Sequence, residues 1–304
     1  MKKKVLVVYY TQSGQLLEIS KNVVSQLEAS EEIDVDFFEI KLKKDFPFPW
    51  DKTSFMDAFP ESFLEIPTDV ANLDDPCLEK RYDLIILSYQ VWYLSPSIPI
   101  NSFLKTQKAR KLFNNTPVLT VIGCRNMWVM AQEKLKRTLV DLGANLVGNI
   151  ALVDKHLNHI SVITIVKWLT SGKKERYLGI FPKPGVAQKD IDESIQFSPI
   201  IKDHVLNGDY NKLHENLLNK GAVTIKSFLV VMDKRANILF DKWAHFILSN
   251  KLKRSLKVKL FKWYLLIAIW IISPIVFLIF LLTCPFLFSK IRKENEYYLS
   301  VKTK

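Results

Sequence analysis

The sequence predicts an α/β protein with a doubly wound, five-stranded parallel sheet, and two observations support that fold class. Short apolar runs rich in β-branched residues alternate with segments of helical periodicity along the first half of the chain. Three of these runs end in unusual polar or aromatic turns. In parallel sheets the carboxyl ends of the strands form the ligand-binding edge, so the three turns are expected to converge there.

Each expected strand has its own justification. The run at residues 5–9 is continuously apolar, which is typical of a strand buried on both faces. Residues 33–40 alternate apolar and polar side chains, as an edge strand does. The five expected strands are residues 5–9, 33–40, 83–89, 116–122 and 145–153, and the helices between them cover residues 16–27, 100–111 and 128–142.

Three regions are expected along the 304 residues. Residues 1–155 form the sheet domain, residues 156–250 form a helical extension that completes or covers the sheet, and residues 251–304 form a basic-flanked membrane anchor. The extension is expected to hold helices at 190–206, 212–232 and 233–250. Within the sheet domain, residues 41–76 carry five prolines and many aromatics. They indicate a packed flap, which either only packs or also faces a substrate.

The positive charge is concentrated at the C-terminus. Residues 249–304 hold eleven Lys or Arg against two Glu, so they contribute +9 of the net charge of +12 and leave +3 for the rest. A nucleic-acid groove would place its basic residues on the folded domain, so this distribution argues against one. It indicates a basic collar around a membrane segment.

Residues 263–288 carry no formal charge, and 26 residues can cross a hydrocarbon core of about 30 Å as a helix. A buried hydrophobic helix is the alternative. The denser basic cluster precedes the segment, which predicts a protein on the cytoplasmic face of the inner membrane. Pro274 leaves two topologies open: a single span, which is favoured, or a shallow hairpin that returns to the same side.

Other signals are weak. No secretory signal pattern is visible after Lys2–Lys4, so the domain is expected to face the cytoplasm. The three cysteines are Cys77, Cys124 and Cys284, and their wide spacing supports neither a disulfide framework nor a metal site.

The first turn has the properties of a phosphate cradle. Hydroxyl and glycine residues stand between a strand and the N-terminus of a helix, where backbone N–H groups and the helix dipole favour an anion. The residues are Thr11, Gln12, Ser13, Gly14, Gln15 and Leu16. The turn has neither the lysine of a Walker A loop nor the Gly-x-Gly-x-x-Gly pattern, which argues against ATP hydrolysis and a standard dinucleotide fold.

Aromatic and polar residues distinguish the second and third turns. The second contains Gln90, Val91, Trp92 and Tyr93, and the third contains Gly123, Arg125, Asn126 and Trp128. Aromatics at a ligand-binding edge suit stacking on a flat heterocycle, although Trp92 could equally be a core anchor. Arg125 is suited to stabilising negative charge on a reduced ring, or else it forms a surface salt bridge.

Together these three turns resemble the three flavin-mononucleotide loops of the flavodoxin-like superfamily, over residues 3–155. The opening through Gln15, the block 124–128, the turn 181–185 and the basic tail also resemble dialkylresorcinol condensing enzymes of bacterial flexirubin and aryl-polyene pigment pathways. The resemblance implies FMN as cofactor and a partner ketosynthase that performs condensation. It implies that this protein oxidises the resulting dialkylcyclohexanedione to the aromatic dialkylresorcinol.

Aromatisation removes a proton beside a carbonyl and a hydride from the neighbouring carbon, so it calls for a base and an oxyanion partner. His156 and His159, just past the fifth strand, are the candidate bases, and Arg125 is the candidate enolate partner. Alternatively, either histidine only hydrogen-bonds its loop.

The expected substrate is a hydrophobic, alkyl-chain cyclic diketone or phenol dissolved in the membrane. A membrane-anchored NAD(P)H:quinone reductase is the alternative enzyme, and an electron carrier or a pathway scaffold is the alternative outside enzymes. Carriers of this type are usually acidic, whereas the soluble part of this chain is slightly basic. A homodimer is one assembly that the sequence leaves open.

Overall fold

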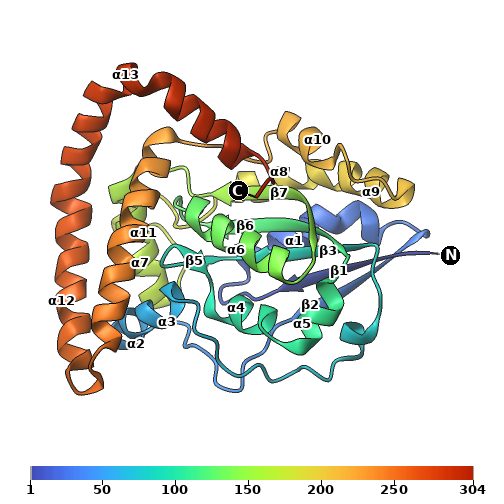
Figure 1. The fold of residues 1–304 in the computed structure, drawn as a ribbon, viewed down its shortest axis with the longest axis horizontal. Helices are drawn as coiled ribbons and strands as arrows, with labels where there is room; N and C mark the ends of the chain where they lie inside the picture. Colours follow the sequence, from blue (N-terminus) through green and yellow to red (C-terminus); the bar gives the residue numbers. More distant parts are fainter. Residues whose placement is uncertain (1, 304) are drawn as a thin grey trace.

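A computed structural model describes residues 2–303 of the chain (Figure 1). Its centre is a five-stranded parallel sheet with the strand order β2-β1-β3-β6-β7. The strands are β1 (Lys3–Tyr9), β2 (Ile33–Glu39), β3 (Leu84–Tyr89), β6 (Pro117–Cys124) and β7 (Asn145–Val153). When the five strands of this sheet are numbered along the chain without the β4–β5 hairpin, their order is 2-1-3-4-5, which confirms the flavodoxin-like fold class. A short antiparallel hairpin, β4 (Val91–Trp92) with β5 (Ser95–Pro96), follows β3.

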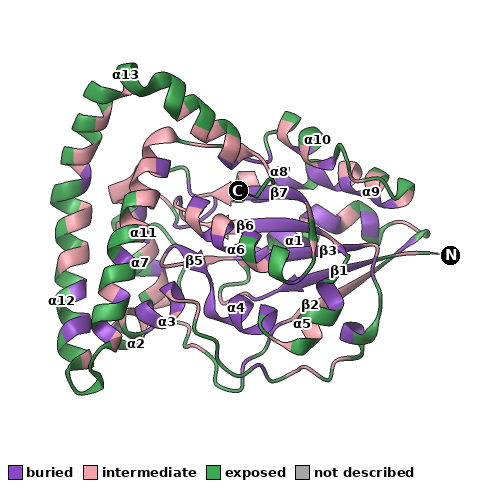
Figure 2. Ribbon diagram, viewed as in Figure 1, coloured by how far each residue is buried: buried purple, intermediate pink, exposed green. Residues whose placement is uncertain are grey.

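Burial along the strands follows the sequence pattern. Val5 to Val8 of β1 and Leu84 to Leu87 of β3 are fully buried, because helices cover both faces of the central strands. The edge strand β2 alternates between buried and partly exposed residues. Figure 2 shows this core as the purple centre of the molecule.

Helices from both halves of the chain cover the sheet (Figure 1). On one face α1 (Gln15–Glu28) packs beside α9 (Ser198–Asn207), and α10 (Leu213–Asn219) packs on β7. The opposite face carries α4 (Ile98–Leu104), α5 (Gln107–Phe113) and α6 (Val129–Asp141). Residues of the expected extension thus lie directly on the sheet.

The remaining helices lie around the carboxyl edge of the sheet and along one side of the molecule. They are α2 (Lys52–Asp57), α3 (Phe59–Phe63), α7 (Asn158–Ser171), α8 (Gln188–Glu193), α11 (Ser227–Leu248), α12 (Arg254–Ile267) and α13 (Ser273–Leu299). Single 3₁₀ turns occupy Pro76–Glu79, Tyr177–Gly179, Ser194–Phe197 and Lys251–Lys253, and a π-helical segment, Ala268–Ile272, joins α12 to α13.

The helix break expected at residue 232 was wrong. The chain instead breaks between α10 and α11, where Gly221 has a φ of 77° and the amide of Ala222 donates to the carbonyl of Leu217. Glycine adopts this left-handed conformation without the penalty of a Cβ, so it ends the helix there. As a result α11 is one continuous helix of 22 residues.

The apolar segment forms one long helix, Lys251–Leu299, with 49 residues. Its most apolar 18-residue window has a mean hydropathy of 3.0 and is only 6% buried, so composition and length alone would allow it to cross a membrane. The helix packs along α11 and then bends back toward the domain (Figure 1). Its outer side is mostly exposed (Figure 2).

Candidate active site at the carboxyl edge of the sheet

A cavity of about 240 Å³ lies where the turns that follow β1, β3 and β6 meet. Residues from all three turns line it, together with the flap, α7 and the turn at 185. The lining residues are Gln12, Ser13, Gln15, Leu16, Phe48, Trp50, Phe55, Ala58, Gln90, Val91, Trp92, Tyr93, Gly123, Cys124, Arg125, Ile165, Trp168, Leu169 and Gly185. The structure therefore brings together most of the side chains that the sequence singled out.

The first turn is built to present backbone N–H groups. The Thr11 Oγ1 accepts a hydrogen bond of 3.1 Å from the Gly14 amide, which folds the turn back on itself. Gly14 has a φ of 79° and precedes α1 without providing a side-chain cap. Ser13 and Gly14 are exposed, so an anion can reach the uncapped N-terminus of this 14-residue helix. Thr11 and Gly14 frame the turn without lining the cavity itself.

The second turn forms the β4–β5 hairpin, and its two central residues are in the left-handed region. Tyr93 has a φ of 48° and Leu94 a φ of 62°, which bulky residues adopt at a cost of about 1–3 kcal/mol each. The flap holds this conformation: the Tyr93 hydroxyl donates to the carbonyl of Phe55, and the Ser62 hydroxyl donates to the carbonyl of Trp92. The strained turn places Trp92 and Tyr93 at the cavity wall.

A buried lysine supports the same hairpin from α6. The Lys134 ammonium donates to the carbonyl of Phe63 at 2.6 Å and to the Ser95 hydroxyl at 2.7 Å, and it lies 3.7 Å from the centroid of the Phe63 ring. Burial lowers the pKa of Lys134 to about 8. The three contacts fix the flap, the hairpin and α6 relative to one another.

Trp92 both lines the cavity and anchors an aromatic cluster. Its ring centroid lies 5.1 Å from that of Phe46, 5.3 Å from Trp50 and 6.1 Å from Tyr10. The Trp50 indole also donates a hydrogen bond of 3.1 Å to the Gln12 Oε1. The flap is thereby joined to the first turn. Its aromatics serve both purposes: some line the cavity, whereas others, Phe59 among them, pack against α11 and α12.

Gln90 carries a buried donor that no residue between 2 and 303 satisfies. Its Nε2 is shielded from solvent and has no hydrogen-bond partner, although Gln90 lines the cavity. Buried polar atoms are almost always paired, so an unpaired amide at a cavity wall indicates a ligand acceptor at that point. A carbonyl or a ring nitrogen of a heterocycle would satisfy it.

The third turn places a desolvated cation at the cavity. Arg125 Nη1 donates to the Asn158 Oδ1 at 2.9 Å and to the Asn158 backbone carbonyl at 3.3 Å, so both bonds go to uncharged oxygens. Burial lowers the pKa of Arg125 to about 10, with Asp154 acting in the opposite direction, and the side chain stays cationic at neutral pH. Its geometry supports an anion-binding role rather than a surface salt bridge.

Close packing at Gly123 lets this turn approach α1. A Cβ at Gly123 would lie 3.1 Å from the Leu16 Cδ1, which is tighter than ordinary side-chain contact. The backbone of the third turn can therefore lie beside the start of α1, with the cavity between them.

Two expected site residues lie elsewhere. Asn126 and Trp128 line a separate cavity of about 160 Å³ beside Asp233, on the α11 side of the third turn. Asn126 donates to the Asn158 Oδ1 at 3.1 Å, and Trp128 is only 3% exposed. They support the third turn instead of lining the main cavity.

Neither candidate base lines the main cavity. His156 is exposed, and its amide donates to the Asp154 carboxylate. His159 Nε2 hydrogen-bonds the carbonyl of Ile269 at 3.0 Å, and its ring lies 5.1 Å from that of Trp270. Both partners belong to the apolar helix, so the structure brings His159 to that helix and not to the cavity.

Sequence reasoning missed the contribution of α7 and of the turn at 185. Ile165, Trp168 and Leu169 form a cavity wall, and a Cβ at Gly185 would lie 2.7 Å from the Trp168 ring. The Gln15 side chain pairs with both backbone polar groups of Val186, at 3.1 and 3.2 Å. Residues 158–171 are apolar on most sides of the helix, so their sequence pattern does not reveal which surface they cover.

The fold and site define a flavodoxin-like α/β protein with a cavity at the switch point of the sheet. No protein-family model matches the chain, and no curated protein matches it.

Solved structures with a similar arrangement include a flavoprotein from Lactobacillus acidophilus in complex with FMN (19% identity, 50% of this chain and 93% of that chain, TM-score 0.37). Oxidised flavodoxin 1 from Bacillus cereus is 14% identical, with 65% of this chain and 95% of that chain covered and a TM-score of 0.35. RosB with the bound intermediate 8-demethyl-8-formylriboflavin-5'-phosphate is 11% identical, covering 71% of this chain and 81% of that chain, with a TM-score of 0.39. At these identities the likeness concerns the fold alone.

Proposed function

We propose that the cavity binds FMN and that the chain is a flavin-dependent oxidoreductase acting on a hydrophobic cyclic substrate. The favoured reaction is the oxidation of a dialkylcyclohexanedione to a dialkylresorcinol. The observation that carries the proposal is the convergence of three turns on one cavity that holds the unpaired Gln90 Nε2 and the Arg125 guanidinium.

The residues present fit FMN. The turn at 11–15 and the N-terminus of α1 offer N–H donors for a phosphate that carries no partner lysine. Trp92, Tyr93 and Trp168 provide flat apolar walls for a ring system. The Gln90 amide has a free donor that suits a carbonyl of the flavin ring.

Bound FMN would accept a hydride from a substrate carbon and pass the two electrons on to dioxygen or a quinone. The chain contributes binding and charge. The Arg125 guanidinium has N–H donors beyond those bonded to Asn158, so it can hold an enolate oxygen or the negative charge of the reduced ring. The flap and α7 contribute apolar walls to the cavity, which would limit the access of water to that charge.

The proton balance of this reaction does not require a strong base. A cyclic 1,3-diketone spreads its negative charge over two oxygens, so it ionises readily in water and can enter as the enolate. Arg125 favours this anionic form by direct electrostatic attraction. Overall the oxidation removes one proton and one hydride, and the enolate has already given its proton to solvent. The final tautomerisation only moves a proton from a ring carbon to an oxygen. Water would relay it, because none of the described residues that line the cavity is His, Asp or Glu.

The lack of His, Asp and Glu among the described lining residues also favours a second candidate, an NAD(P)H:quinone reductase. Hydride transfer from flavin to a quinone places less demand on a base from the protein. A one-electron carrier is a weaker candidate. Carriers exchange electrons through an accessible ring edge, whereas the flap and α7 lie over this cavity.

The pigment-pathway assignment and the partner ketosynthase depend on the resemblance of the sequence. The turn at 181–185, which contributes to that resemblance, also contributes Gly185 to the cavity wall. This position connects the resemblance with the proposed site.

The test uses the full chain, purified in detergent. A yellow protein that releases FMN on heating supports the cofactor. Anaerobic bleaching by a dialkylcyclohexane-1,3-dione, with formation of the resorcinol, supports the favoured reaction. Bleaching by NADPH with rapid turnover of a soluble quinone, and none by the dione, would replace it with the reductase.

A further inference from the structure

We propose that the apolar helix Lys251–Leu299 does not cross the bilayer, but lies along one leaflet with both of its ends held by the domain on the same side of the membrane. This topology goes beyond the proposed chemistry and does not depend on flavin. It differs from the single span that the sequence favours.

Much of the helix is exposed along its length (Figure 2), and its exposed residues include many large apolar side chains. Between residues 263 and 288 no side chain is charged, and large apolar side chains point away from the domain. The most exposed are Leu278 (60%), Leu282 (74%), Phe286 (88%) and Phe288 (64%). A surface of this kind requires an apolar partner.

The N-terminal end of the helix is fixed to the flap. The Arg254 guanidinium forms ion pairs of 2.7 Å with Asp57 and with Glu61. About two turns later the Phe261 ring stacks on Phe59 at a centroid distance of 3.7 Å. Two cations of the expected basic collar therefore bind other residues of the protein. Arg254 forms these ion pairs, and Lys257 donates to the carbonyl of Phe246.

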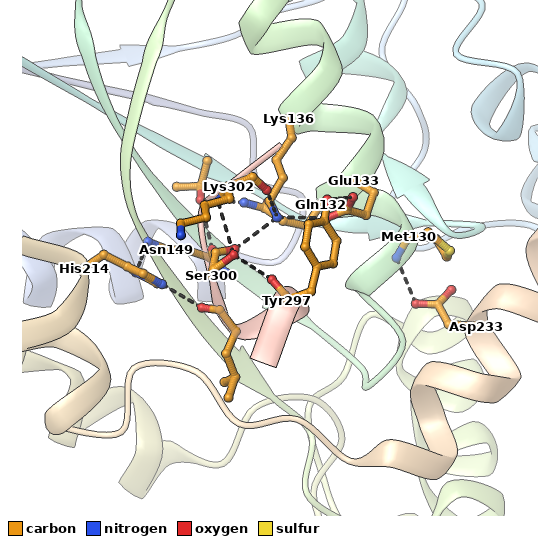
Figure 3. A network of polar contacts seen from close by, with 12 residues as sticks. Met130, Gln132, Glu133, Lys136, Asn149, His214, Asp233, Tyr297, Ser300 and Lys302 are labelled. Atoms are coloured by element: carbon orange, nitrogen blue, oxygen red, sulfur yellow. Dashed lines mark hydrogen bonds and ion pairs between the residues drawn. The ribbon is translucent and has the colours of Figure 1, made fainter. Parts of the chain in front are cut away.

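The C-terminal end of the helix is fixed to the same domain, at residues of α6 and α10 (Figure 3). Tyr298 is 7% exposed within the main core, and the Tyr297 hydroxyl donates to Glu133 at 2.6 Å. The Lys136 ammonium, itself 2% exposed, donates to the backbone carbonyls of Ser300 and Lys302, both at 3.0 Å.

A further contact completes this docking. The amide of Asn149 in β7 donates to His214 Nδ1, so the neutral ring donates from Nε2 to the carbonyl of Leu299 at 2.7 Å. Burial lowers the pKa of His214, which favours this neutral form. The chain end is thus held by residues from α6, α10 and β7 together.

These two attachments are incompatible with a span. A spanning helix would place its C-terminal end about 30 Å away, across the hydrocarbon core, on the side opposite the domain. Tyr298 would then leave the core, and Lys136 would lose both carbonyls. The helix instead bends back toward the domain (Figure 1), and Pro285 inside α13 supplies a cause, because it removes one helical hydrogen bond.

The charges around the helix select lipid as its partner. Exposed cations flank the apolar surface at both ends, namely Lys251, Lys253, Lys259, Lys262, Lys290 and Lys293. The only acidic residues after position 248 are Glu294 and Glu296, which pair with Lys234 and Arg292. Apolar side chains bordered by lysines match an anionic bilayer surface, whereas a second copy of the chain would bring cations against cations.

The experiment maps the side of the membrane on which residue 303 lies. Two variants with one introduced cysteine each, Thr303→Cys at the chain end and Glu31→Cys on the domain, are made in a Cys284→Ser background that keeps Cys77 and Cys124, and both introduced positions are exposed. Inside-out vesicles from a bacterial expression host are treated with a membrane-impermeant maleimide, with the background protein measuring labelling of Cys77 and Cys124.

Equal labelling of both variants in inside-out vesicles, and of neither in intact spheroplasts, is the expected result. Labelling of residue 303 only in spheroplasts would show a span and overturn the proposal. So would recovery of the chain as a soluble oligomer that fails to float with phosphatidylcholine–phosphatidylglycerol vesicles. The double variant Lys259→Ser, Lys262→Ser is expected to weaken vesicle binding by about fivefold per residue. Unchanged binding would argue against the lipid contact.

Discussion

Gln90 and Arg125 show how single residues indicate a ligand. Gln90 offers a buried donor without a partner among residues 2–303, and Arg125 a desolvated cation whose bonds within that range go to Asn158 oxygens. The sequence predicted both positions from their place after a strand. It could not predict that the Gln90 donor stays unpaired, or that Arg125 bonds to a residue 33 positions away in α7. Asn126 and Trp128 show the limit of the same reasoning, because two residues of one turn can face different cavities.

Arg125→Gln is expected to slow anaerobic flavin reduction by a cyclohexanedione about 10–100-fold, because hydrogen bonds to charged groups contribute about 1.5–3 kcal/mol. Arg125→Lys keeps the positive charge but loses the planar guanidinium group, so its rate of flavin reduction should lie between those of the parent and of Arg125→Gln. Stopped-flow absorbance measures the rates, and the FMN content of each variant is the control. A parent-like rate in the glutamine variant would remove Arg125 from the reaction.

Asp233→Asn tests a second buried group. Asp233 Oδ2 accepts from the Met130 amide at the start of α6, and burial raises the pKa of this carboxyl from 3.8 to about 7 (Figure 3). A raised carboxyl pKa means that the folded state holds its proton at a pH where the unfolded chain has lost it. Stability is therefore present below about pH 4 and is lost as the pH rises toward 7.

Asparagine can still accept from Met130 but does not ionise. The melting temperature of Asp233→Asn relative to the parent should therefore increase from pH 4.5 to pH 8, by differential scanning fluorimetry of the full chain. A constant difference across that range would show that Asp233 ionises normally.

At the scale of elements, the five strands were predicted within a few residues, since each buried run carries its own apolar pattern. The parallel, doubly wound sheet and the shared edge were predicted from the alternation of strands with helices, and the structure adds the strand order. The position of α7 could not be predicted in this way. Its apolar residues are spread around the helix and single out no one face, and only the tertiary structure places Trp168 against Gly185 and the cavity.

Gly185→Ala tests this wall. The added Cβ would lie 2.7 Å from the Trp168 ring and 2.9 Å from the Gln15 Oε1, at a φ of 78°. Gly179→Ala is a matched control, because Gly179 has a φ of 71° but nothing within 4 Å of its Cβ. Both variants should lose about 1–2 kcal/mol from the left-handed backbone.

Only Gly185→Ala should also weaken FMN binding, by at least tenfold in a fluorescence titration, because it displaces Trp168. Equal FMN affinity in the two variants would show that the turn at 185 does not contribute to FMN binding.

At the scale of the whole molecule, residues near the C-terminus pack into the core that β1 also forms. The residues that follow the apolar helix return to α6, α10 and β7, so the last part of the chain contributes Tyr298 to the core that the first strand begins. Local sequence patterns describe the helix as apolar and long, which favours a span. They contain no information on contacts such as that between Lys136 and residue 302.

Lys136→Met tests the docking of the C-terminal residues. Losing the charged donor to two carbonyls is expected to reduce the free energy of unfolding by about 1–3 kcal/mol and to speed chymotrypsin cleavage near Tyr297. Lys220→Met, at an exposed position, is the control and should change neither property. If the two variants behave alike, the C-terminal docking contributes little to stability.

The central claim is that the convergent turns hold a flavin that a cyclic diketone reduces. The visible absorbance spectrum of the detergent-purified full chain, recorded anaerobically before and after a dialkylcyclohexane-1,3-dione is added, tests it most directly. We expect a flavin spectrum that bleaches on addition, with one dialkylresorcinol formed per flavin. A colourless protein that takes up no added FMN would contradict the site, and a flavin that the diketone leaves oxidised would contradict the reaction.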